Sequence, residues 1–156
     1  MYTTSLRILK DSAEAEDAMQ EAFLTAFSKL HTLQNKSDFG TWLKRIVVNQ
    51  SISVYRKRVQ HLDIDEKPVY ALSQEALEDN QEDYSAIKAQ QVVDAIESMK
   101  DNYRNILNLH YIEGYDHEEI AEIMRLSYAN SRTMLSRAKT HLKQLLSNNN
   151  GYGKRI

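Results

Sequence analysis

Cysteine is absent from this chain of 156 residues, and proline and glycine are scarce, with one proline and four glycines. Without cysteine the chain can form no disulfide, no thiolate metal site and no cysteine nucleophile. Because sheets need frequent turns, the shortage of glycine and proline favours an all-helical protein. No apolar run approaches the length of a membrane span, and no basic-then-apolar leader opens the chain, so we expect no membrane insertion and a cytoplasmic location.

Patterns typical of catalysis are missing as well. The five histidines are scattered without the spacing of metal ligands, and the chain has no glycine-rich phosphate loop and no nucleophile elbow. We therefore expect no catalytic residue, no cofactor and no metal site, and so no enzyme.

Charge is distributed unevenly along the chain, although the formal net charge is only −2. Eight acidic residues and one lysine fall between Leu62 and Tyr84, which leaves nineteen basic and fourteen acidic residues elsewhere. This stretch also contains the only proline, Pro68, and lacks a sustained apolar stripe. Residues 59–83 are therefore predicted to be an acidic linker between two helical regions.

A helix-turn-helix is predicted between Gly114 and Lys143. Asp116 and Glu119 have the spacing of a capping box, which predicts a helix over about residues 116–124. After a short break, Ser127 can cap a second helix. The apolar positions of this helix recur at three- and four-residue spacing: Leu135, Ala138, Leu142 and Leu145.

The second of these helices keeps its basic residues off the apolar stripe, and we expect its N-terminal half to be exposed and polar through Asn130, Ser131 and Thr133. Residues 125–156 hold seven basic residues and no acid. An ordinary helical bundle with a solvated basic face would explain the apolar stripe but not this charge distribution. Such a helix can lie in the major groove of DNA, where arginine suits guanine edges and Asn or Ser reaches other bases or phosphates.

Near the N-terminus, Asp11 can cap a helix over about residues 13–30. The apolar residues of this helix are expected to form a continuous core face: Ala15, Ala18, Met19, Ala22, Phe23, Ala26, Phe27 and Leu30. A second stripe contains Asp17, Gln20, Glu21, Leu24 and Ser28. This stripe is either a solvated face with one stray leucine or a surface for a partner.

Ser37 can cap a further helix over about residues 38–58. We expect its inward-facing residues to be Phe39, Leu43, Ile46, Val47 and Val54. A neighbouring stripe carries Trp42, Arg45, Asn49 and Arg56. An aromatic ring beside Arg and Asn suits single-stranded nucleic acid, whereas the alternative role for the tryptophan is a core anchor.

Beyond the linker, helices are predicted over about residues 84–99 and 102–113, with His110 as a core histidine on the second. Three runs now stand in order along the chain: AEDAMQEAFLTAFSKL (15–30), FGTWLKRIVVNQSISVYRKR (39–58) and, after the acidic linker, YRNILNLHYIEGYDHEEIAEIMRLSYANSRTMLSRAKTHL (103–142). Together they resemble a bacterial RNA polymerase sigma factor of the small extracytoplasmic-function group.

The resemblance implies an all-α fold of two small helical domains joined by an acidic linker. Residues 1–58 would form a domain like sigma region 2, and residues 84–147 a helix-turn-helix domain like sigma region 4. Residues 148–156 would be a disordered basic tail. The family usually has a further helical turn or two ahead of Tyr2, so we expect the first helix to be incomplete.

The resemblance also implies roles for particular residues. Core polymerase would be bound by Asp17, Gln20, Glu21 and Leu24. The minus-ten element would be bound by Trp42, Arg45, Asn49, Arg56, Lys57 and Arg58, with a flipped-out base in the loop 33–38. The minus-thirty-five element would be bound by Asn130, Arg132, Thr133, Ser136 and Arg137. Ser131 and Met134 replace what are commonly an apolar and a basic residue, so one positive contact is missing.

The function so implied is transcription initiation without chemistry of the chain's own. Its partners would be core RNA polymerase, promoter DNA as duplex and melted strand, and an anti-sigma protein, with the free chain a monomer. One alternative is a stand-alone helix-turn-helix regulator of duplex DNA, which usually dimerises, and no obvious dimerisation helix is present. Another is a helical protein-binding adaptor, which leaves the basic C-terminal third unexplained.

Overall fold

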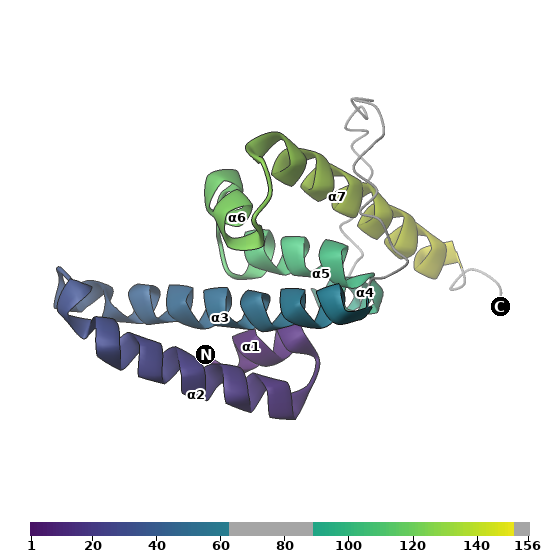
Figure 1. The fold of residues 1–156 in the computed structure, drawn as a ribbon. Helices are drawn as coiled ribbons and strands as arrows, with labels where there is room; N and C mark the ends of the chain where they lie inside the picture. Colours follow the sequence, from purple (N-terminus) through teal and green to yellow (C-terminus); the bar gives the residue numbers. More distant parts are fainter. Residues whose placement is uncertain (63–88, 152–156) are drawn as a thin grey trace. The chain divides into compact units, whose positions relative to one another are not determined.

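The computed structural model describes residues 1–62 and 89–151, where every regular element is helical. The chain divides into two compact units. The first contains α1 (Tyr2–Leu9), α2 (Ser12–Lys29), η1 (Leu30–Thr32), η2 (Lys36–Asp38) and α3 (Phe39–Leu62). The second contains α4 (Ala89–Ser98), α5 (Asp101–Leu107), the π-helix η3 (Asn108–Ile112), α6 (His117–Met124) and α7 (Tyr128–Gly151) (Figure 1). The predicted fold class is confirmed, while most of the predicted linker lies outside the described residues.

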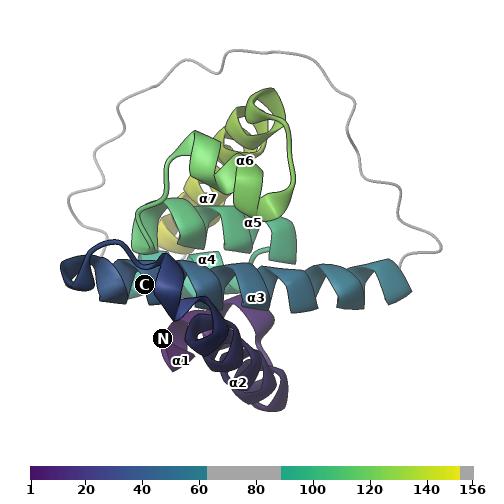
Figure 2. The same ribbon diagram turned by 60° about the vertical axis from the view of Figure 1, so that its left-hand side comes forward.

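In the first unit, α1 and α2 pack against each other and lie along α3 (Figures 1 and 2). Asp11 caps α2 as predicted, since its Oδ1 accepts a hydrogen bond from the Glu14 N–H at 2.9 Å. Two buried hydroxyls join the three helices: Ser51 Oγ on α3 lies 2.8 Å from Ser5 Oγ on α1, which lies 3.5 Å from the Ala15 carbonyl oxygen on α2. Because buried polar groups need partners, these contacts favour one alignment of the helices.

The buried side of α2 is narrower than predicted. Its fully buried residues are all alanines: Ala15, Ala18, Ala22 and Ala26. Phe23 and Phe27 each follow one of these alanines, and therefore point about 100° away from the stripe. Both are exposed, Phe27 by 83%, and so is Leu30, where η1 begins. The expectation that these three residues belong to the core is wrong, because the small alanine stripe already fills the packed side.

The buried face of α3 also differs from the predicted one. Leu43 and Val47 are buried as expected, but Phe39 is 44% exposed. The rest of the face consists of Val48, Ser51, Ile52 and Tyr55, which were not predicted. Asn35, rather than Ser37, supplies the cap here: its Oδ1 accepts a hydrogen bond from the Ser37 N–H at 3.2 Å and starts η2, which leads into α3. An asparagine side chain reaches the N–H two residues ahead, which favours such turns.

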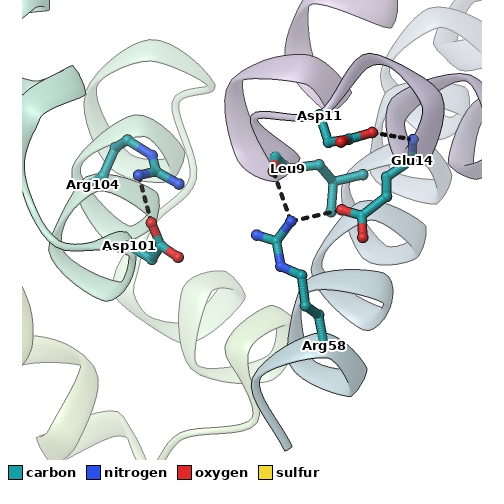
Figure 3. A network of polar contacts seen from close by, with 6 residues as sticks. All are labelled: Leu9, Asp11, Glu14, Arg58, Asp101 and Arg104. Atoms are coloured by element: carbon teal, nitrogen blue, oxygen red, sulfur yellow. Dashed lines mark hydrogen bonds and ion pairs between the residues drawn. The ribbon is translucent and has the colours of Figure 1, made fainter. Parts of the chain in front are cut away.

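In the second unit, α7 packs on α4, α5 and α6. The buried apolar residues of this unit include Ala95, Ile96, Met99, Ile106, Leu107, Leu109, Ile120, Ile123, Leu135, Ala138 and Leu146. Arg104 is buried among them and donates to Asp101 Oδ1 at 2.6 Å, which secures the first turn of α5 (Figure 3). α7 continues to Gly151, so residues 148–151 of the predicted disordered tail are helical, and residues 152–156 lie outside the described part.

Among the helices of residues 1–62 and 89–151, none combines the length and the apolar character needed to cross a membrane. In the same part of the chain, no three His, Cys, Asp or Glu side chains gather as a metal site requires.

Candidate nucleic-acid interface

The helices α6 and α7 form the predicted helix-turn-helix. Asp116 and Glu119 make both bonds of a capping box: the Glu119 N–H donates to Asp116 Oδ1 at 2.9 Å, and the Asp116 N–H donates to Glu119 Oε2 at 3.1 Å. Arg125 ends α6 in the left-handed region, with φ 54°. The Ser127 hydroxyl then accepts a hydrogen bond from the Asn130 N–H at 3.1 Å. These caps define where both helices start and keep the turn between them short.

The first turns of α7 present the predicted groove-facing residues. Asn130, Arg132, Thr133 and Ser136 are exposed, whereas Arg137 is half-buried. Exposed Asn, Arg, Thr and Ser side chains supply the hydrogen-bond donors and acceptors that a major-groove edge requires. The structure therefore brings four of the five residues to one exposed side of the helix, and their contacts with DNA stay a prediction.

Ser131 lies on the opposite side of α7, and its expected exposure is wrong. It is fully buried, and its Oγ has no hydrogen-bond partner among the described residues. The reason is the helical period: Ser131 lies four residues before Leu135 and seven before Ala138, so the three share the buried stripe.

Charged and apolar side chains share an exposed surface on α2. The four residues predicted to bind a partner are all exposed: Asp17, Gln20, Glu21 and Leu24, the last by 66%. Two more exposed residues, Phe23 and Phe27, belong to the same helix. We call these six residues the α2 face. Large exposed apolar groups gathered in this way mark interaction sites.

The two phenylalanines were missed as surface residues because the sequence analysis assigned every apolar residue of α2 to one stripe. The spacing of the alanines could have revealed them. Four alanines at three- and four-residue steps complete a helical face without any larger side chain. The phenylalanines that follow Ala22 and Ala26 are then left outside it.

The stripe predicted to bind an opened strand lies on α3. Trp42 and Arg45 are half-buried and Asn49 is exposed. The Trp42 ring lies 6.0 Å from the ring of Phe39, at the start of the helix. Trp42 is thus a partly exposed ring rather than a fully buried core anchor, and base stacking on it stays a prediction.

The three basic residues near the end of α3 differ in their surroundings. Lys57 is exposed and Arg56 is half-buried. Arg58 Nη1 lies 2.7 Å from Glu14 Oε2 and donates to the Leu9 carbonyl oxygen at 3.0 Å (Figure 3). The charge of Arg58 is therefore partly neutralised within the unit, which makes Lys57 the more accessible cation for a phosphate.

Comparison with known protein families covers both units. Residues 1–60 match sigma-70 region 2, and residues 89–142 match sigma-70 region 4. The chain is 31% identical over 146 residues to the ECF RNA polymerase sigma factor SigM of Bacillus subtilis, an alignment that covers 93% of this chain and 87% of SigM. It is 30% identical over 146 residues to the ECF RNA polymerase sigma-E factor of Escherichia coli, with 82% and 71% covered.

A solved structure has a similar fold. It is the co-crystal structure of the sigma factor RpoE in complex with the anti-sigma factor NepR from Bartonella quintana. The TM-score is 0.57 at 22% sequence identity, with 94% of this chain and 89% of that chain covered. At this identity the likeness concerns the fold.

Proposed function

This chain belongs to the extracytoplasmic-function group of RNA polymerase sigma factors, and we propose that its α2 face docks on core RNA polymerase while α3 and α7 hold the promoter. The chain is a factor for transcription initiation. It would carry no chemistry of its own and would act in the cytoplasm, where the polymerase works.

Docking on the polymerase is assigned to the α2 face. Its acidic residues, Asp17 and Glu21, offer charge, while Leu24, Phe23 and Phe27 offer apolar surface. Interfaces combine a central apolar cluster with a polar rim, and aromatic residues commonly dominate their energy. The mixed character of the α2 face fits a protein partner better than it fits DNA, since DNA would repel the carboxylates.

Promoter recognition is assigned to both units. Asn130, Arg132, Thr133, Ser136 and Arg137 on α7 would contact the minus-thirty-five element. The α3 residues that would hold the minus-ten element are Trp42, Arg45, Asn49, Arg56, Lys57 and Arg58. Within the predicted domain limits, residues 1–58 would bind the minus-ten element and residues 84–147 would bind the minus-thirty-five element. Arg58 would contribute least, because Glu14 already pairs with it.

An anti-sigma protein is a proposed third partner. The RpoE structure contains such a protein, NepR, and its sigma chain has a similar fold. The α2 face also carries three large apolar side chains that are exposed: Phe23, Leu24 and Phe27. An inhibitor that covered it would prevent the polymerase from binding, and release of the inhibitor would restore it.

The exposure of Phe27 and Leu24 is the observation that carries the proposal. A stand-alone regulator of duplex DNA binds through its helix-turn-helix, and contact with the duplex requires no exposed apolar face on a separate unit. The test is co-elution of the purified chain with core RNA polymerase in size-exclusion chromatography. We expect a stoichiometric complex, whereas elution of the two components at their separate volumes would favour the stand-alone regulator.

A further inference from the structure

Four aromatic rings form a continuous column through the helix-turn-helix unit. The His110 ring contacts Tyr111 edge-on, with centroids 4.8 Å apart, and stacks on His117 at 5.5 Å with 18° between the planes. The His117 ring meets Tyr128 edge-on at 6.1 Å. The Arg132 guanidinium carbon then lies 6.0 Å from the Tyr128 ring centroid. The ring column therefore links η3 and α6 to the recognition helix, and it ends on an arginine assigned to promoter contact.

The backbone around η3 explains the position of the first histidine. The Glu113 N–H donates to the Asn108 carbonyl at 2.9 Å, which widens this turn into a π-helix. His110 Nδ1 lies 3.0 Å from the Tyr115 carbonyl oxygen. A carbonyl oxygen only accepts hydrogen bonds, so Nδ1 of His110 carries the proton and donates it. This bond orients His110 in both its neutral and its charged form.

His117 differs from His110 because its Nδ1 is buried without a hydrogen-bond partner among the described residues. A proton on that nitrogen would be a buried, unpaired donor. Burial lowers the pKa of His117 below its usual 6.5, and His110, Arg132 and Lys139 lower it further, while Asp116 opposes them. These groups face His117 from η3, α7 and the cap of α6. The neutral ring is therefore the form that fits the column.

We propose that Tyr128 and His117 are positioning residues for Arg132: His117 supports the Tyr128 ring, and this ring holds the guanidinium where it can meet the minus-thirty-five element. The proposal rests on the proposed function of Arg132. An exposed arginine samples many conformations, and a ring beneath the guanidinium removes part of the entropy that DNA binding would otherwise cost. Tyr128 is itself about half exposed, at 49%, and its ring meets the His117 ring edge-on.

The positioning role predicts an unusual pH dependence. Protonation of His117 places its charge beside His110, Arg132 and Lys139, and so disrupts the stack and releases Arg132. Folding favours the neutral ring, so the contribution of this ring to stability is complete above a pH of about 6.5 and is lost as the pH falls below it. DNA affinity should decrease once His117 becomes protonated in the folded chain, which happens below pH 6.5 because its pKa is lowered. A histidine that only added positive charge near phosphates would produce the opposite change.

The first test is independent of DNA. In NMR spectra of the full chain, the side-chain protons of Arg132 should show an upfield ring-current shift that disappears in Tyr128→Leu. The shift should also diminish as the pH is lowered from about 7.5 to values below 6.5, where His117 becomes protonated, because its pKa in the folded chain is lowered. Without such a shift in the wild-type chain the positioning proposal is overturned, whatever Arg132 does on DNA.

The second test is a double-mutant cycle on a duplex carrying the minus-thirty-five element, at fixed salt, with the full chain. Tyr128→Leu should weaken binding about two- to five-fold, and should have no further effect in the Arg132→Ala background. Additive losses would show that Tyr128 contacts DNA by itself and would overturn the proposal. If Arg132→Ala leaves affinity unchanged while the ring-current shift is present, Arg132 does not contact the minus-thirty-five element. The role given to Arg132 under the proposed function then fails, and the part of the positioning proposal that concerns the promoter fails with it.

The third test compares affinities at about pH 7.5 and at the lower pH where the ring-current shift of Arg132 has diminished. The wild-type chain should lose affinity relative to His117→Gln, a neutral variant of similar length. His141→Gln is the matched control, because His141, on α7, is also half-buried and its ring contacts Tyr103 rather than the column. It should behave as the wild type does. An equal pH response in wild type and His117→Gln would overturn the role of His117.

Discussion

Arg58 and Glu14 form an ion pair, 2.7 Å between Nη1 and Oε2, that joins the end of α3 to the first turn of α2. The same guanidinium donates to the carbonyl oxygen of Leu9, at the end of α1. One side chain therefore ties together all three helices of the first unit. The resemblance to sigma factors had assigned this cation to DNA.

We predict that Arg58→Ala lowers the free energy of unfolding of the chain by about 1 kcal/mol, since it removes a part-exposed ion pair and one charged hydrogen bond. Lys57→Ala is the matched control, because Lys57 is its exposed neighbour, and it should cost less than about 0.5 kcal/mol. Urea denaturation of both variants measures the difference. Equal stability of the two variants would mean that the ion pair contributes nothing. For promoter binding we expect the opposite order: Lys57→Ala should reduce the affinity for the promoter more than Arg58→Ala does.

Leu24→Arg and Phe27→Ala should each weaken binding to core polymerase, by about 2 kcal/mol or more if these residues are at the centre of the interface. Neither should change the helical content or the midpoint of unfolding appreciably, because both side chains are largely exposed. Circular dichroism and a binding titration separate the two effects. Val93→Ala is the control, since Val93 is an exposed apolar residue outside the α2 face. Loss of helicity in Leu24→Arg would show that Leu24 is needed for the core.

Ser131→Ala should stabilise the helix-turn-helix unit by about 0.5 to 1 kcal/mol. The hydroxyl of Ser131 is buried and unpaired within the described part of the chain, so its removal relieves a desolvation cost. Ser136→Ala, at an exposed position of the same helix, should leave stability unchanged. Thermal unfolding reports both effects. A loss of stability in Ser131→Ala would reveal a hydrogen bond that the folded unit depends on.

Asn49→Ala should leave the closed complex nearly intact and reduce promoter opening, because Asn49 is exposed on the stripe assigned to the melted strand. Capture of unpaired bases is worth about 1 to 3 kcal/mol per base. A premelted bubble template should restore much of the lost transcription, since the cost of unpairing has been removed. Equal defects on bubble and duplex templates would place Asn49 in folding or polymerase docking instead.

Local signals in the sequence predicted the helix-turn-helix well. Asp116, Glu119 and Ser127 act within three residues of their partners, so spacing alone identified these caps. The burial of Phe27 and Ser131 was predicted wrongly, because it depends on which side of a helix meets its neighbours. Alanine and serine are less hydrophobic than phenylalanine. The alanine stripe of α2, and Ser131 four residues before Leu135, therefore indicated burial less strongly than a phenylalanine does. The ion pair of Arg58 joins residues 44 positions apart, and no local pattern reveals such a contact.

Promoter opening is the measurement that tests the central claim most directly. Core RNA polymerase, with and without the chain, is incubated on a duplex promoter selected by the complex, and unpaired thymines are detected by their reactivity to permanganate. The chain should produce reactive thymines near the start site and transcripts from that site, and Leu24→Arg should abolish both. Binding of the chain to the duplex without reactive thymines or transcripts, in the presence of core polymerase, would contradict the account.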